Sequence, residues 1–264
     1  PGGRVIAIDR DPRAVQLTRE RLRGRPQAVV IQGNYGDLAA VVGEMGVTEV
    51  DGVLIDAGLS SMQLDDPDRG FSFQMDGPLD MRMDSSTGET AAELLGRASV
   101  EGLTTMLLDF GDVPKARRVA RAIVERRDEA PIAKTRDLVD VLIQVYHTKG
   151  RVPDETRQVF QAVRIAVNGE LDSLERGVRA AVDLLKGEGR LVCITFHSGE
   201  DRIVKNALRD ASKPTHDYFP DGRTRATHPP KLRLLTKRPV EATDDEIAAN
   251  SRAHSARLRA AEKI

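Results

Sequence analysis

Residues 51–84 have the sequence DGVLIDAGLSSMQLDDPDRGFSFQMDGPLDMRMD. The apolar run from Val53 to Ile55 is typical of a buried strand, and it leads directly to the carboxylate of Asp56. In an open α/β sheet, ligands bind at this carboxyl end of the strands. The sequence then shows little helical period as far as residue 84, and long irregular connections in compact domains are usually functional. We therefore expect the chemistry of this protein at Asp56 and in the segment after it.

Apolar runs alternate with helical patterns on both sides of this segment. Residues 4–9 and 28–31 have the composition of buried parallel strands, and Asp11 followed by Pro12 predicts the start of a helix. The later elements that we expect are a long helix over 156–185, a strand over 190–196 and an edge strand, antiparallel or parallel, over 232–237. This alternation predicts an α/β fold with a doubly wound parallel sheet.

A stretch with helical spacing and no convincing strand interrupts the pattern from residue 90 to residue 146. The clearest helices in it are expected over 115–127 and 135–146. We interpret the stretch as an inserted helical domain. The expected organisation is a core made of residues 1–88 and 153–264, with residues 89–152 as the insertion.

The composition excludes several classes of protein. The chain has 264 residues with 40 basic and 41 acidic side chains, so no overall field favours nucleic acid or a membrane surface. No apolar run approaches the roughly 18 residues of a membrane span. The single cysteine, Cys193, excludes an internal disulfide and favours a reducing compartment, which we take to be the cytoplasm. We expect no metal site.

Any contact with RNA must therefore come from local basic patches. The first candidate is the helix expected over 115–127, where Arg117, Arg118 and Arg121 lie off the apolar face. The second is the tail from Arg223 to Arg259. A solvated helix face is an equally good explanation of the arginines.

Three side chains follow three of the expected strands. Asp9 is placed to accept hydrogen bonds from the ribose hydroxyls of a nucleoside cofactor, although an Asp before a helix is often only a cap. Tyr35 could lie against an adenine ring, or it could be a half-buried loop tyrosine. Asp56 completes the row. The combination suits a cofactor that is either a dinucleotide or S-adenosylmethionine.

The segment DAGLSSMQLDDPDRGFSFQMDGPLDMRMD resembles the signature of the bacterial small-subunit ribosomal RNA (cytosine-N4) methyltransferases. Further similar segments, in order along the chain, are ARRVARAIVERR from Ala116, TRQVFQAVRIAVNGEL from Thr156, GRLVCITFHSGEDRIVK from Gly189 and SRAHSARLRAAEK from Ser251. The resemblance implies a Rossmann-like S-adenosylmethionine-dependent methyltransferase core with an inserted all-helical domain. It also implies methylation of the exocyclic amine of a cytidine in the decoding region of 16S rRNA, in the small ribosomal subunit.

The resemblance further implies that the residues matching Asp9, Tyr35, Asp56 and Gln63 bind the cofactor. In the family a glycine-rich loop follows the first strand, and that loop is expected to precede Pro1, so we expect the chain to be a fragment or the product of a displaced start. Gly199 stands where the family usually has Leu, and Gly169 where it usually has Asp. Val152-Pro153 replaces a usual His-Pro pair.

The amino nitrogen of cytosine is a poor nucleophile, because its lone pair is delocalised into the ring. An enzyme can accept a hydrogen bond from the amine, align it with the methyl group and exclude water. We expect Asp56 to be this acceptor, with Ser60 and Ser61 as orienting groups. His197 is the alternative proton acceptor, or else it fixes its loop by hydrogen bonds.

Four other side chains near the signature have two interpretations each. Phe71 and Phe73 could stack on an extruded base or belong to the core. Arg69 and Arg82 suit phosphate contacts or bracing of the loop.

Two other functions remain open at this point, a non-catalytic RNA-binding module and a nicotinamide-dependent Rossmann oxidoreductase. The oligomeric state is also open, with a homodimer among the options.

Overall fold

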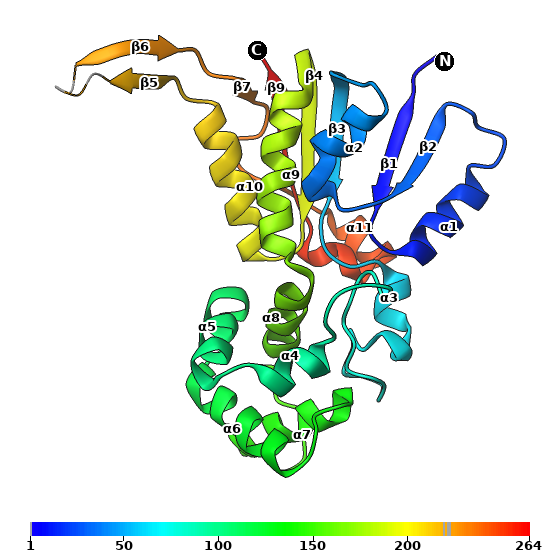
Figure 1. Ribbon diagram of the computed structural model, residues 1–264, viewed down its shortest axis with the longest axis vertical. Helices are drawn as coiled ribbons and strands as arrows, with labels where there is room; N and C mark the ends of the chain where they lie inside the picture. The colour runs from blue at the N-terminus through cyan, green and yellow to red at the C-terminus, as the bar shows by residue number, and fades with distance from the viewer. Residues whose placement is uncertain (1, 219, 221–222) are drawn as a thin grey trace. The chain divides into compact units, whose positions relative to one another are not determined.

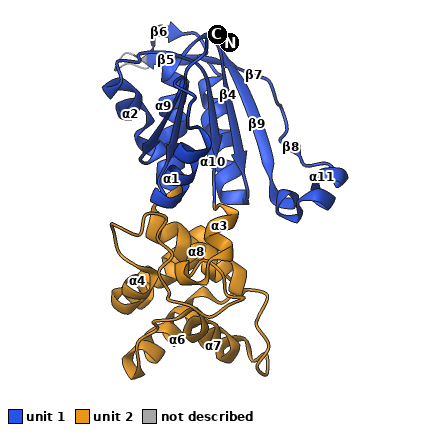
Figure 2. Cartoon of the chain, turned by 90° about the vertical axis from the view of Figure 1, so that its right-hand side faces the viewer, with its two compact units in different colours: residues 1–58, 171–264 blue, residues 59–170 orange. Residues whose placement is uncertain are grey.

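The computed structural model describes residues 2–218, 220 and 223–264. The chain forms two compact units, of which unit 1 comprises residues 1–58 and 171–264 and unit 2 comprises residues 59–170 (Figure 2). Unit 1 contains strands and helices, and unit 2 is helical. None of the described helices is long and apolar enough to cross a lipid bilayer.

The first part of unit 1 alternates strands and helices as expected. Its elements are β1 (Val5–Asp9), α1 (Pro12–Arg21), β2 (Ala28–Gln32), the 3-10 helix η1 (Tyr35–Asp37), α2 (Leu38–Glu44) and β3 (Val50–Asp56). The side chain of Asp11 caps α1 by accepting from the N–H of Arg13 at 2.9 Å, and Pro12 occupies the first turn, which confirms the predicted helix start. Strands β1 and β2 are parallel, with Asp9 opposite Gln32.

The second part of unit 1 completes a mixed sheet. Its elements are α9 (Glu170–Leu184), β4 (Leu185–Thr195), α10 (Ser198–Ala211), β5 (Thr215–Tyr218), β6 (Thr224–His228), β7 (Leu232–Leu234), β8 (Val240–Glu241), α11 (Asp244–Ala249), the 3-10 helix η3 (Ser251–Ser255) and β9 (Arg257–Lys263). The larger sheet has the order β3-β4-β9-β7, with β8 also paired to β9, while β1 and β2 form a sheet of their own and β5 pairs with β6 (Figure 1).

The α/β class is confirmed, but the sheet is not wholly parallel. Strand β3 is parallel to β4, whereas β9 is antiparallel to both β4 and β7. The edge strand at β7 was predicted from the sequence, but β9 was not. The sequence of β9, RLRAAEK, has three basic residues and no β-branched residue, so it lacks the composition of a strand.

Helices α9 and α10 pack against one face of the larger sheet. Leu174 and Val178 of α9 share a hydrophobic cluster with Leu191 and Cys193 of β4 and with Val204 of α10. Cys193 is fully buried there, and burial raises the pKa of its thiol to about 12. Side chains alternate between the two faces of a strand, so the residues of β4 that flank Leu191 and Cys193 face the other side of the sheet.

The long helix expected over 156–185 is in fact two helices, α8 (Thr156–Asn168) and α9. Gly169 ends α8 in the left-handed region, with φ of +59°, and its N–H donates to the carbonyl of Ile165. Apolar spacing that continues through Gly169 predicted one helix, but glycine is the residue best suited to a left-handed helix end. The interpretation of Gly169 as an interior helix residue was wrong.

Unit 2 is built from short helices around one hydrophobic core. Its elements are α3 (Ser61–Asp65), the 3-10 helix η2 (Pro67–Arg69), α4 (Ala91–Arg97), α5 (Val100–Gly111), α6 (Ala116–Glu129), α7 (Thr135–Tyr146) and α8. The two helices predicted over 115–127 and 135–146 correspond to α6 and α7.

The irregular segment before α4 also belongs to unit 2. Phe71, Leu79 and Met81 of this segment are buried in the same hydrophobic cluster as the helices. The side-chain amide of Asn168, at the end of α8, donates to the carbonyl of Met81 at 2.7 Å, and its oxygen accepts from the N–H of Met83 at 2.8 Å. The compact unit therefore extends over 59–170, wider than the insertion expected over 89–152, because buried contacts join the segment and α8 to the other helices.

Candidate functional site

The candidate residues of unit 1 form two groups at the ends of parallel strands. Asp9 ends β1, and Tyr35 begins the turn after the neighbouring strand β2. Asp56 ends β3 opposite Ile194 of β4, and His197 follows β4 directly. Parallel pairing thus brings together Asp9 with the Tyr35 turn, and Asp56 with the segment that contains His197.

Asp9 is not the cap of the following helix, since Asp11 has that role. One carboxylate oxygen of Asp9, Oδ1, accepts a hydrogen bond from the N–H of Asp11 at 2.8 Å. Burial raises the pKa of Asp9, and this effect is opposed by hydrogen bonds from the backbone of Asp11 and of Arg10. An ionised carboxylate has about four lone-pair sites, so these bonds leave acceptor capacity for a hydroxyl group.

Tyr35 is half-buried and held against α9. A Cβ atom added at Gly177 would lie 2.8 Å from Cδ2 of Tyr35, so only glycine leaves room for the ring at that position. The turn is fixed by Asn34, whose oxygen accepts from the N–H of Gly36 at 2.8 Å and whose amide donates to Ser173 at 2.9 Å. The contact with α9 orients the ring. Whether adenine lies against it stays a prediction.

Asp56 has an exposed side chain at the end of β3. Among the described residues it makes no side-chain hydrogen bond. Partial burial of the carboxyl raises its pKa, and the negative charge of Glu200 raises it further. A carboxylate that is partly buried and lies near a second negative charge is a good acceptor for a polarised N–H, because its own negative charge is not neutralised by a cation.

His197 and Glu200 lie at the start of α10. The Nε2 atom of His197 is 3.3 Å from Oε1 of Glu200, but it is buried and has no hydrogen bond of good geometry. Glu200 is 2% exposed, and its Oε2 accepts from the N–H of Phe196 at 2.8 Å. The sequence pointed to His197, whereas Glu200 was not among the predicted site residues. The signal was present, since a carboxylate in the first turn of a helix after a strand is placed near that strand's end.

Gln63 lies in α3 of unit 2, where it is buried. Its Oε1 accepts from the N–H of Ser60 at 3.0 Å, and Oγ of Ser60 accepts from the N–H of Gln63 at 3.3 Å. This reciprocal capping box fixes the start of α3. Ser61 is exposed beside it. The cofactor role of Gln63 and the orienting roles of the two serines stay predictions.

The structure decides between the alternatives for the other signature residues. Phe71 is buried, and Phe73 packs edge-to-face on Phe160 with ring centroids 5.3 Å apart. Both therefore pack in the core of unit 2, which is the second of the two interpretations of these side chains.

The arginines of the signature brace the loop. Arg69 donates to the carbonyls of Arg82 and Met83 at 2.9 and 2.8 Å. The guanidinium of Arg82 forms a bidentate pair with Asp80, at 2.9 and 2.7 Å.

The two basic segments differ in how many of their cations face solvent. Arg117, Arg118 and Arg121 are exposed on α6, and among the described residues none of them pairs with a carboxylate. Arg118 contacts the Nε2 atom of His147 at 2.7 Å. In the tail, by contrast, Arg259 is 7% exposed and paired with Asp201, so its inclusion in an RNA-binding patch was wrong.

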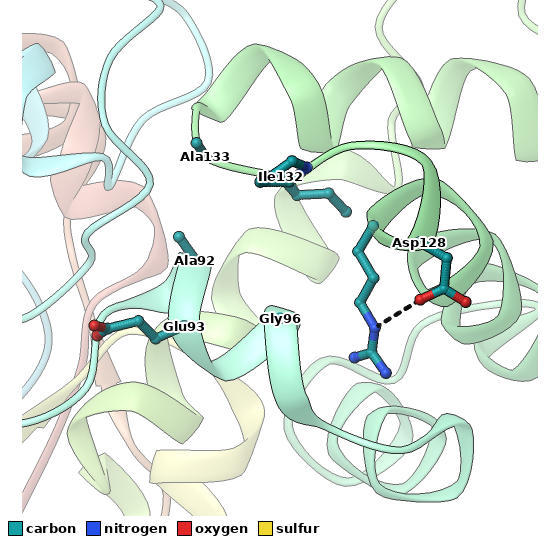
Figure 3. Close-up of a pocket in the computed structure, with 8 residues that line it drawn as sticks. Ala92, Glu93, Gly96, Asp128, Ile132 and Ala133 are labelled. Carbon is teal, nitrogen blue, oxygen red and sulfur yellow. Dashed lines mark ion pairs between the residues drawn. The ribbon is translucent and has the colours of Figure 1, made fainter.

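A pocket of about 430 Å³ opens in unit 2 (Figure 3). The residues that line it are Ala92, Glu93, Gly96, Arg127, Asp128, Pro131, Ile132 and Ala133. None of the predicted site residues is among them. The guanidinium of Arg127 donates to the carbonyls of Leu95 and Ala98, which supports the end of α4. We therefore do not assign the pocket a function. No group of three or more His, Cys, Asp or Glu side chains in the described part of the chain is placed to hold a metal ion.

Parallel strands with acidic residues at their carboxyl ends define a Rossmann-like α/β protein with a helical second unit. The model of the MraW methylase family matches residues 1–264, and the chain belongs to this family. A protein of Shewanella baltica named "Ribosomal RNA small subunit methyltransferase H" is 43% identical over 99% of this chain and 84% of its own length. A protein of the same name from Trichlorobacter lovleyi is 45% identical over 100% of this chain and 85% of its own length.

Proposed function

We propose that this chain transfers a methyl group from S-adenosylmethionine to the N4 amine of a cytidine in the decoding region of 16S rRNA. The printed name of the relatives, which specifies the small ribosomal subunit, supports the substrate, and the resemblance of residues 56–84 to the cytosine-N4 enzymes supports the atom. The observation that carries the proposal is the pair of strand-end carboxylates, Asp9 and Asp56, each with acceptor capacity left over. A substrate in ribosomal subunits places the activity in the cytoplasm.

The residues of unit 1 fit a nucleoside cofactor. The carboxylate of Asp9 keeps acceptor capacity next to a helix start, as binding of a ribose hydroxyl requires. The Tyr35 ring is held in a fixed orientation at the neighbouring strand end. S-adenosylmethionine supplies an electrophilic methyl group on a sulfonium when it is bound.

The role of Asp56 is to polarise the amine. A hydrogen bond from N4 to the carboxylate increases the electron density on nitrogen and fixes the direction of its lone pair. The raised pKa of Asp56 strengthens this acceptor, because the carboxylate is partly desolvated and faces the negative charge of Glu200. A hydrogen bond that strengthens as positive charge develops on nitrogen lowers the barrier to methyl transfer.

Asp56→Asn tests the proposal, because it retains the shape and removes the charge. Single-turnover methylation of small subunits with saturating cofactor should fall by about two orders of magnitude, while binding to the subunits stays at the level of the parent. Asp51→Asn is the matched control, since Asp51 lies at the other end of the same strand and pairs with Lys186 at the surface. Equal rates for the parent and Asp56→Asn would remove Asp56 from the reaction.

Cofactor binding separates the proposal from its rivals. Thermal stabilisation by S-adenosylhomocysteine, with none by NAD, supports methyl transfer over hydride transfer. Tight binding of small subunits with no incorporation of methyl groups would instead identify a non-catalytic RNA-binding module.

A further inference from the structure

Glu200 is a buried acidic group that acts on both candidate catalytic residues of unit 1. It contacts the backbone at Phe196, and its Oε1 lies 3.3 Å from Nε2 of His197. Its negative charge also acts on Asp56 across the neighbouring strand end. A carboxylate that is 2% exposed is retained in this position only if other polar groups satisfy it.

His197 is oriented by its surroundings rather than by solvent. Its side chain is 13% exposed, and Nε2 is within reach of Glu200 but slightly misaligned for a hydrogen bond. Catalytic hydrogen bonds are often long in the absence of substrate and shorten when it binds. A small rotation of the imidazole ring gives an Nε2–H donor to Oε1.

Gly199 lies against the Nδ1–Cε1 edge of the ring. A Cβ atom at this position would lie 3.1 Å from both Nδ1 and Cε1 of His197, closer than most real contacts of a Cβ atom. Glycine therefore lets the ring keep this position, and a larger residue would crowd it.

We propose that Glu200 is a positioning residue that fixes the proton of His197 on Nε2, so that Nδ1, on the edge of the ring that faces Gly199, carries the lone pair. The proposal rests on the proposed methyl transfer and assigns its proton acceptor. Which nitrogen of a histidine acts as the base is set by the hydrogen bond that the other nitrogen makes.

The lone pair on Nδ1 of His197 provides a base for the proton that must leave N4 during the reaction. Methyl transfer forms a C–N bond at N4 and breaks the C–S bond of the donor, whose electron pair stays on sulfur. The N4 nitrogen then holds one proton too many, and Nδ1 of His197 takes it. The imidazolium that results lies beside the carboxylate of Glu200, whose charge also acts on Asp56, while the neighbouring Asp201 is neutralised by Arg259.

The tautomer of His197 can be observed directly by long-range ¹H–¹⁵N correlation spectra of the 264-residue chain. The chain has five histidines, and His197→Gln assigns the signal. We expect a proton on Nε2 in the parent protein and a mixture of tautomers in Glu200→Gln. A proton on Nδ1 in the parent would overturn the proposal, whatever the variant does.

Kinetics provide the second measurement. In Glu200→Gln, the kcat for methylation of small subunits should fall at least about tenfold, with an unchanged KM and unchanged binding of S-adenosylhomocysteine. Glu200→Asp should recover part of the rate. Glu175→Gln is the matched control, because Glu175 forms an exposed i,i+4 pair with Arg179 on α9. A rate for Glu200→Gln equal to that of Glu175→Gln would show that Glu200 does not position the base.

The two measurements also separate this proposal from the function on which it rests. If the parent does not methylate small subunits, the proposed function fails, while the tautomer of His197 still decides whether Glu200 fixes the ring. Gly199→Ala is a further variant that leaves Glu200 in place. It should displace the ring and lower kcat, and an unchanged kcat would exclude Nδ1 as the proton acceptor.

Discussion

Arg259 and Asp201 form a buried bidentate ion pair that joins β9 to α10. Nε of Arg259 lies 2.7 Å from Oδ1 of Asp201, and Nη2 lies 2.9 Å from Oδ2. The pair accounts for a basic residue in the middle of the sheet, because the guanidinium is neutralised where it is desolvated. The hydrogen bonds from Arg259 also hold the pKa of Asp201 below its ordinary value.

Removing one partner of this pair should destabilise the fold strongly. Asp201→Asn leaves a buried cation, and we expect a loss of about 3–5 kcal/mol in the free energy of unfolding. The double variant Asp201→Asn with Arg259→Met should recover part of the loss. Urea denaturation measures both, with Asp172→Asn as a control at an exposed pair with Arg176, where less than about 1 kcal/mol is expected.

The same pair gives a dependence on pH. Asp201 has a lower pKa in the folded state than in the unfolded state, so its contribution to stability is complete above the unfolded value. The contribution is lost as the pH falls through the lowered value. Acid titration of the parent and of the double variant should therefore differ at the acidic end. Parallel stability curves in that range would contradict this account.

Gly169 should be sensitive to substitution in a way that its neighbours are not. Its φ of +59° strains any residue with a Cβ, so Gly169→Ala should destabilise the protein by about 1–2 kcal/mol. Gly169→Asn should have a smaller effect, because Asn tolerates this conformation.

Gly96 is the matched control for Gly169, since it lies inside α4 with open space around it and no positive φ. Gly96→Ala should stabilise the protein by about 0.5–1 kcal/mol. Thermal denaturation of the two variants measures their changes in stability, which should have opposite signs. A stable Gly169→Ala variant would mean that α8 and α9 can continue as one helix.

Asp9→Ala should weaken the binding of S-adenosylmethionine. A charge-assisted hydrogen bond contributes roughly 1.5–3 kcal/mol, so the Kd should rise by about 10- to 150-fold. Because burial raises the pKa of Asp9, ionisation of this carboxyl opposes folding above its folded-state pKa, and removing the charge does not destabilise the protein at neutral pH.

Isothermal titration calorimetry measures the change in affinity for Asp9→Ala. Asp9→Asn provides a finer test, because it retains an acceptor for the N–H of Asp11. Asp183→Ala, which removes a surface pair with Lys231, should bind the cofactor as the parent does. An Asp9→Ala protein that binds with the affinity of the parent would exclude the ribose contact.

The exposed arginines of α6 should contribute to binding of the small subunit. Each phosphate neutralised adds about 0.7–0.9 to the slope of log affinity against log salt, so replacing Arg117, Arg118 and Arg121 by Gln should lower that slope by about 2–3. Cofactor affinity should not change, because none of the three arginines is among the residues expected to bind the cofactor.

A control for the arginines replaces three exposed cations that already pair with carboxylates, Arg136, Arg179 and Arg190. It changes the net charge by the same amount. Identical salt slopes for the two triple variants would show that the α6 arginines form only a solvated face.

Local rules predicted much of the fold. Asp11 and Pro12 set the start of α1 through a cap and a fixed backbone angle, and both depend on neighbouring residues only. The apolar spacing of residues 135–146 likewise matched the bounds of α7. Asp56 was found because an apolar run, Val53 to Ile55, ends directly before it, although Leu54 of this run is exposed in the structure.

The sequence did not predict features that depend on distant partners. Strand β9 is held between β4 and β7, and its basic composition is compatible with burial only because Asp201 lies across from Arg259. The break at Gly169 was hidden by apolar residues that keep a helical period on both sides. Glu200 resembles an ordinary first-turn acid until its burial and its distance to His197 are known.

The burial of Cys193 provides a means of observing how the sheet opens. A thiol reacts as its thiolate, which is scarce at neutral pH when the pKa is about 12, and Cys193 has no exposed surface. Because the chain has one cysteine, a thiol reagent added to the native protein modifies a single position. Its rate of reaction therefore reports the separation of β4 from α9 and α10, and comparing it with the rate of global unfolding shows whether this part of unit 1 opens by itself.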